Sequence, residues 1–171
     1  TTLYDHIYPK IKTSLSDKRN VLELKKIFNS LINSNSDALA ATIPSKSIYT
    51  NMDMENKIFK FIGVSKDDIK EAIKASPDIP KESDKWRVIK NPVYMATMFL
   101  VIYFNNMKND EMRNQSMFIC SLYMYRNVRS KYFKKTSQAT ISIMEYTLNR
   151  LSYKNDLKKY GSILKMIAKK S

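Results

Sequence analysis

A run of basic and aromatic side chains near residue 130 is the part of this sequence whose residue types most clearly suggest chemistry. Within residues 123–135, tyrosine and phenylalanine are interleaved with arginine and lysine. Aromatic rings can stack on nucleobases while guanidinium and ammonium groups pair with phosphates. The pattern therefore predicts a nucleic-acid-binding surface that contains Tyr125, Arg126, Arg129, Lys131, Tyr132, Lys134 and Lys135.

The same run has a second interpretation. If it lies on one long helix, its apolar members form a buried stripe and its charged members are simply hydrated. The stripe would consist of Tyr125, Val128, Tyr132 and Phe133. Both interpretations stay open at the level of sequence.

The end of the chain carries an amphipathic pattern. At about 100° per residue, Leu157, Tyr160, Leu164, Ile167 and Ala168 share one face of a helix. The opposite face carries Lys158, Lys159, Lys165, Lys169 and Lys170. Such a helix can lie on nucleic acid, on an acidic protein or on an anionic membrane. We expect nucleic acid as the partner, with a protein partner or self-association as the alternative. A membrane ranks last because the apolar face has no Trp or Phe.

Positive charge is concentrated towards the C-terminus. Residues 1–111 hold 17 Lys/Arg and 14 Asp/Glu, whereas residues 112–171 hold 13 and 2, so the net charges are +3 and +11. A surface of this kind attracts polyanions through their phosphates. Lys outnumbers Arg 24 to 6, which is also expected from an AT-rich genome, so codon bias is a second source of basicity.

The side chains that most catalytic sites require are scarce. The chain has one histidine, His6, one cysteine, Cys120, and two glycines, Gly63 and Gly161. These numbers exclude a glycine-rich nucleotide loop and disfavour a Cys/His zinc site or a Cys-His nucleophile pair. The carboxylates of 67–71 alternate with lysines, which is typical of a solvated helix face. We therefore expect no catalytic residue, metal or cofactor, and no enzyme activity.

Composition favours an all-α fold. Only two glycines and five prolines occur, and a many-stranded sheet would need more glycine in its turns. We expect an irregular bundle of about seven or eight helices around a central apolar helix at about 92–104. We expect the whole chain, 1–171, to form a single domain, with a hinge loop at 77–91 between the N-terminal half (1–76) and the basic C-terminal half (92–171).

Local signals predict where several helices begin and end. Leu3, Ile7, Ile11 and Leu15 recur every four residues, Asp17 can cap the next helix, and the polar run 33–36 is expected to end it. Gly63 suits a helix C-terminus and Ser65 with Asp68 resembles a capping box. Asn91 followed by Pro92 begins the apolar helix. Three further helices are expected at 112–135, 137–151 and 155–170.

The apolar residues of the centre suggest a different role. Met95, Met98, Met107, Met112, Met117 and Met124 cluster in the sequence with Tyr94, Phe99, Tyr103, Phe104 and Phe118. Core packing is the first interpretation. The alternative is an exposed patch through which a structural or assembly subunit, such as a phage or viral virion component, contacts its neighbours.

Cysteine usage and hydropathy suggest a compartment. A single cysteine forms no internal disulfide, and the N-terminus carries no recognisable secretory signal. The longest apolar run, 93–104, is shorter than the roughly 20 residues of a membrane-spanning helix. We expect the cytoplasm or a virion interior, and the sequence leaves open whether the chain is a fragment.

Overall fold

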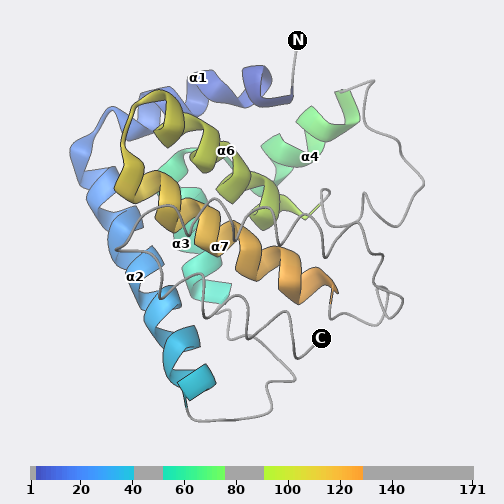
Figure 1. Cartoon of the computed structure of the whole chain (residues 1–171). Coiled ribbons are helices and arrows are strands. Elements are labelled where there is room, and N and C mark those ends of the chain that lie inside the picture. Colours follow the sequence, from blue (N-terminus) through green and yellow to red (C-terminus); the bar gives the residue numbers. More distant parts are fainter. Residues whose placement is uncertain (1–2, 41–51, 76–90, 129–171) are drawn as a thin grey trace.

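The described part of the protein is built from helices alone. The computed structural model describes residues 3–40, 52–75 and 91–128, and these ranges contain helices and no strand, as the composition predicts. In Figure 1, α6 and α7 run side by side, α1 crosses one end of α6 and α2 descends along one edge. The helices are α1 (Leu3–Leu15), α2 (Lys18–Ala40), α3 (Met52–Ile62), α4 (Lys66–Ala75), α6 (Pro92–Asn106) and α7 (Asp110–Val128).

Helix α1 follows the predicted stripe. Ile7, Ile11 and Leu15 are all buried, since a spacing of four residues brings them to the same face. Pro9 lies inside the helix rather than in its first turn. Proline lacks an N–H, so one backbone hydrogen bond is missing at this position.

Helix α2 begins as predicted and ends later than predicted. The Asp17 carboxylate accepts a hydrogen bond from the Arg19 N–H at 2.9 Å, as an N-cap does. The expectation that the polar run 33–36 ends this helix is wrong, because α2 continues to Ala40. The Ser34 hydroxyl donates to the Ser30 carbonyl at 2.8 Å, which is a bond that an exposed serine makes without leaving the helix.

The α3–α4 junction confirms two local predictions. Gly63 has φ +72° and its N–H donates to the Phe59 carbonyl at 3.2 Å, so it ends α3 in the left-handed region. The Ser65 N–H donates to Asp68 at 2.9 Å and the Asp68 N–H donates to the Ser65 hydroxyl at 3.0 Å. This reciprocal pair is the capping box, and it orients the start of α4.

Helix α6 starts at the predicted residue. The Asn91 side chain accepts from the N–H groups of Val93 and Tyr94 at 2.9 and 3.1 Å, and Pro92 occupies the first turn. The helix buries side chains all round, as its continuous apolar sequence requires. They are Val93, Tyr94, Met95, Ala96, Thr97, Phe99, Leu100, Tyr103 and Phe104.

A tight turn joins α6 to α7. The Asn109 N–H donates to the Phe104 carbonyl at 2.9 Å and the Lys108 N–H donates to the Asn105 carbonyl at 3.1 Å. This is the bonding of a Schellman motif, which needs a left-handed residue, and Lys108 fills that position with φ +54°. The Asn109 side chain then accepts from the Met112 N–H at 3.2 Å and caps α7. The turn returns the chain so that α7 packs against α6.

Several predictions fall outside the described residues. These include all but Asn91 of the hinge loop 77–91, the end of the helix 112–135, and the helices at 137–151 and 155–170. Within the described ranges, no helix is both long enough and apolar enough to cross a membrane.

Candidate functional site

The described structure reaches only the first residues of the predicted basic surface. Tyr125 and Arg126 lie in the last turns of α7, and their side-chain positions are not described. The remaining predicted site residues lie outside the described ranges: Arg129, Lys131, Tyr132, Lys134, Lys135, Lys158, Lys159, Lys165 and Lys169. The described ranges therefore do not test whether the predicted set comes together, and the site stays a prediction.

Helix α7, which precedes the predicted basic residues, makes two polar contacts with α2. The Gln115 side chain of α7 donates to the Asn29 side chain of α2 at 3.1 Å. Glu111, at the start of α7, forms a 2.7 Å ion pair with Lys25 of α2. Both contacts join residues far apart in sequence, so they fix α7 against α2.

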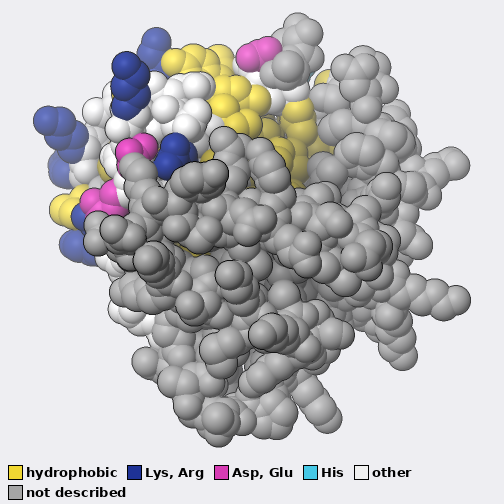
Figure 2. Space-filling model, in the orientation of Figure 1, with side chains coloured by type: hydrophobic (Ala, Val, Ile, Leu, Met, Phe, Trp, Pro, Cys, Tyr) yellow, Lys and Arg dark blue, Asp and Glu magenta, His cyan; other side chains and the backbone are white. Residues whose placement is uncertain are grey.

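Charges on the described helices are largely balanced. In Figure 2, Lys and Arg side chains gather over α1 and the start of α2, and acidic side chains lie among them. Lys10 contacts Asp68 at 2.8 Å, and Arg19 contacts Asp17 at 3.0 Å. The Lys10 ammonium and the Ser65 N–H lower the pKa of Asp68. Mixed charge of this kind is typical of a solvated protein surface.

The methionine and aromatic residues of the centre mainly form the core. The buried members of the set are Tyr94, Met95, Phe99, Tyr103, Phe104, Met112 and Phe118. Met98 and Met117 are half-buried and Met107 is 60% exposed. The Met124 side chain is not described. Core packing therefore accounts for most of this set, and Met107 is its one strongly exposed member among the described residues.

The two residues that most often act as nucleophile or base, His6 and Cys120, lie on different helices. His6 is exposed on α1, whereas Cys120 is buried on α7. Burial raises the pKa of the Cys120 thiol to about 12, although hydrogen bonding with Thr97 and Tyr94 acts in the opposite direction. Within residues 3–40, 52–75 and 91–128, no three His, Cys, Asp or Glu side chains are grouped so that they could hold a metal ion.

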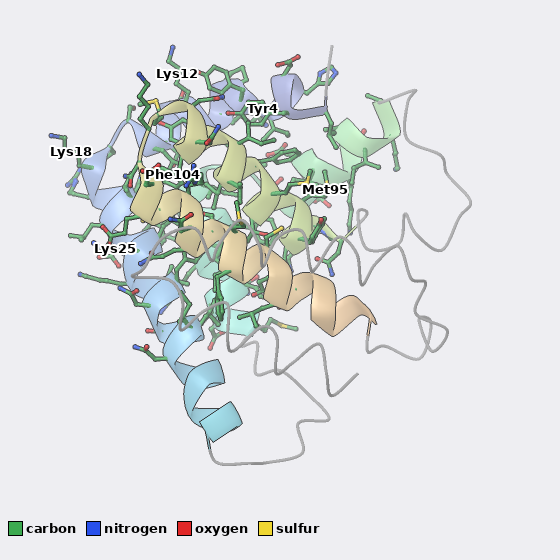
Figure 3. The ribbon with its side chains drawn as sticks, viewed as in Figure 1. Tyr4, Lys12, Lys18, Lys25, Met95 and Phe104 are labelled. Carbon is green, nitrogen blue, oxygen red and sulfur yellow. The ribbon has the colours of Figure 1, made fainter. Side chains whose placement is uncertain are left out.

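A small cavity opens between α1 and α6. Its volume is about 240 Å³, and it is lined by Tyr4, Asp5, Tyr8, Tyr103, Asn106 and Met107. The first three are neighbours on α1, and the last three belong to the end of α6 and its cap. Figure 3 shows Tyr4 between these two helices, and Figure 2 shows a band of hydrophobic side chains in this region.

The aromatic rings at this cavity support one another. The Tyr4 ring centre lies 5.6 Å from that of Tyr8 and 5.9 Å from that of Phe99, both with tilted rings. Burial, followed by the neighbouring Tyr8, Tyr103 and Asp5, raises the pKa of Tyr4 to about 12. The Tyr4 hydroxyl oxygen is buried and has no hydrogen-bond partner among the described residues. Tyr4 is thus packed against two other rings, and its hydroxyl oxygen is buried.

Sequence reasoning did not identify this cavity. Tyr4 and Tyr8 are four residues apart and share a helix face, which is the one local signal. Tyr103 and Met107 show the same spacing on α6 and its cap. Nothing in the sequence, however, indicates that the two pairs face each other across helices about a hundred residues apart.

Most of the chain matches the model of a known protein family. Residues 45–171 match the model of a family described as a family of unknown function, DUF8549. The chain belongs to this family. The matched range covers α3 to α7 and the basic C-terminal residues, and it includes the α6 side of the cavity but not its α1 side. Comparison with curated proteins gave no match, and comparison with solved structures gave none.

Proposed function

We propose that this chain is a non-enzymatic helical module that binds nucleic acid, or another polyanion, through its basic C-terminal surface. Tyr125 and Tyr132 would stack on bases, and the basic side chains would pair with phosphates. These are Arg126, Arg129, Lys131, Lys134 and Lys135, assisted by Lys158, Lys159, Lys165 and Lys169. We further expect seven or eight helices in all, arranged around the apolar helix at about 92–104.

The distribution of charge is the observation that carries this proposal. The described residues, 3–40, 52–75 and 91–128, contain 14 Lys/Arg and 11 Asp/Glu, a net charge of +3, whereas residues 129–171 contain 11 and 2, a net charge of +9. Several Asp and Glu side chains of the described residues already form ion pairs with Lys or Arg side chains of the described residues. The excess positive charge of 129–171 has few acids of its own to balance it, so an external polyanion is the natural counterpart.

The packing of α7 also supports the proposal, because this helix would position the first residues of the basic surface. Helix α7 is held by α6 and α2, and it carries Arg126 in its last turn, directly before the basic run. A rigid helix positions side chains more accurately than a loop does. This arrangement supports a binding module in which α7 presents the start of the basic surface.

Fluorescence anisotropy of labelled oligonucleotides tests the proposal. We expect single- or double-stranded probes to bind with micromolar or tighter affinity that falls steeply with salt, because phosphate contacts release counterions. The variant Arg126→Ala/Arg129→Ala/Lys131→Ala should lower the affinity by roughly tenfold and reduce the salt slope by about three, one for each phosphate that is no longer neutralised.

A matched control removes the same charge elsewhere. Lys18, Lys57 and Lys70 are exposed on α2, α3 and α4, so their triple alanine variant has the same net charge as the first variant. We expect it to bind nearly as well as the parent. Equal loss of affinity in both variants would mean that only net charge matters. Absence of binding at low salt would contradict the proposal and favour the alternative, a structural or assembly subunit.

A further inference from the structure

We infer that the cavity between α1 and α6 binds a small quaternary or methylated ammonium group. None of the described residues that line the cavity belongs to the basic C-terminal set, so the inference does not rest on the function proposed above. Its volume of about 240 Å³ lies below the roughly 300–1,000 Å³ that drug-sized ligands occupy. A cavity of this size suits a compact head group rather than a nucleotide or a large cofactor.

The two walls of the cavity present electron-rich groups. On α1, the rings of Tyr4 and Tyr8 touch each other and so form one continuous aromatic wall, with the Asp5 carboxylate beside it. Tyr103 and the polar Asn106 of α6 line the cavity from the other side, together with Met107 at the cap of that helix. Aromatic faces attract cations through their quadrupole, and groups of aromatic rings are the usual receptors of quaternary ammonium ligands.

Charge selects a cation over other small ligands. The protein has a net charge of +14, yet no Lys or Arg is among the described residues that line this cavity, whereas Asp5 is. The nearest evidence for the attraction is Lys12, whose ammonium lies 5.9 Å from the centre of the Tyr8 ring. Lys12 is exposed and does not line the cavity, and its distance from the Tyr8 ring is within the roughly 6 Å at which a cation and an aromatic face attract each other.

The walls are already in place without a ligand. Tyr4 is packed between Tyr8 and Phe99, and Tyr103 is buried against Phe104 with ring centres 5.2 Å apart. Packed rings lose little conformational freedom on binding, which favours affinity. A tyrosine phenol is neutral at physiological pH even with its ordinary pKa of about 10, so the attraction comes from the ring faces and the Asp5 carboxylate.

Two compounds of the same shape test whether the cavity recognises positive charge. They are choline and its uncharged isostere, in which a carbon atom replaces the nitrogen. Each is titrated into the full chain at constant ionic strength while nitrogen–proton correlation spectra are recorded. We expect choline to shift the amide signals of residues 4–8 and 103–107 saturably, and the isostere to bind about tenfold more weakly, as a cation–π site requires. Equal binding of the two compounds, or shifts spread over the whole protein, would overturn the inference.

Substitutions at Met107 test the site without endangering the fold, because this side chain is 60% exposed. Met107→Lys should abolish choline binding by placing a competing ammonium at the cavity, and Met107→Glu should strengthen it by a few-fold. Choline binding that is unchanged in Met107→Lys would contradict the inference.

Two substitutions on α1 test the side of the cavity that this helix forms. Tyr8→Leu removes a ring and should weaken choline binding by about tenfold. Asp5→Asn removes the charge at an exposed position and should weaken binding by a few-fold. Thermal melts confirm that each variant is folded. A second titration with a trimethyl-lysine amide distinguishes the two sources of this head group, a free small molecule or a modified lysine side chain, according to which binds more tightly.

Discussion

Gly63 illustrates how one residue sets the distance between two helices. A Cβ atom at this position would lie 2.8 Å from the Ser14 Cβ and 3.1 Å from its hydroxyl, and the residue has φ +72°. The Ser14 hydroxyl in turn donates to the Phe61 carbonyl at 2.6 Å. The position therefore requires glycine both for its backbone conformation and for the close approach of α1 to the end of α3.

We predict that Gly63→Ala destabilises the protein by about 2 kcal/mol. Urea unfolding followed by far-ultraviolet circular dichroism measures the change. A double-mutant cycle with Ser14→Gly separates the two causes, because that change removes the clash and leaves the backbone cost. A free energy of unfolding within about 0.5 kcal/mol of the parent would contradict both the close α1–α3 approach and the left-handed conformation of Gly63.

At the scale of the element, the turn between α6 and α7 carries a local conflict. Lys108 occupies the left-handed position of a Schellman motif, with φ +54°, although a side chain with a Cβ disfavours this region. The hydrogen bonds from Lys108 and Asn109 to the end of α6 hold it there. The turn is therefore less stable with lysine at this position than it would be with glycine.

We expect Lys108→Gly to stabilise the protein by about 0.5–1 kcal/mol, since the relief of the left-handed cost exceeds the extra freedom that glycine gives the unfolded chain. The urea midpoint reports the gain. Lys108→Ala is the matched control, because it removes the same charge but keeps the Cβ. If alanine stabilises as much as glycine, charge rather than backbone conformation is the cause.

For the molecule as a whole, Cys120 reports how tightly the helices are packed together. Its side chain is buried on α7, and its thiol donates to the Tyr94 carbonyl of α6 across 4.0 Å. Burial raises the pKa of the thiol to about 12, and only the thiolate reacts with alkylating agents. Reaction in the native protein therefore requires α6 and α7 to separate.

We predict that Cys120 is alkylated at least about a hundredfold more slowly in the native protein than in urea, because opening costs several kcal/mol. Iodoacetamide labelling at mildly alkaline pH, followed by mass spectrometry, measures both rates. The rate should rise as pH approaches the raised pKa and should also rise in Gly63→Ala. Rapid labelling of the native protein would mean that α6 and α7 are not closely packed.

The sequence by itself determined the features that depend on neighbouring residues. The caps at Asp17 and Asn91, the Gly63 terminus and the Ser65–Asp68 capping box all appear where their residue types predict them. Each is made by side chains and backbone groups within a few residues, so composition and spacing contain the necessary information. The all-helical character of the described residues follows from the same local preferences.

Tertiary structure decided what depends on distant residues. The polar run 33–36 continues α2 instead of ending it, and the central methionines and aromatic residues are mostly buried. The cavity beside Tyr4 and Tyr103 exists only because α1 crosses the end of α6. Such features arise when the apolar faces of separate helices pack together, and one-dimensional spacing contains no measure of which faces meet.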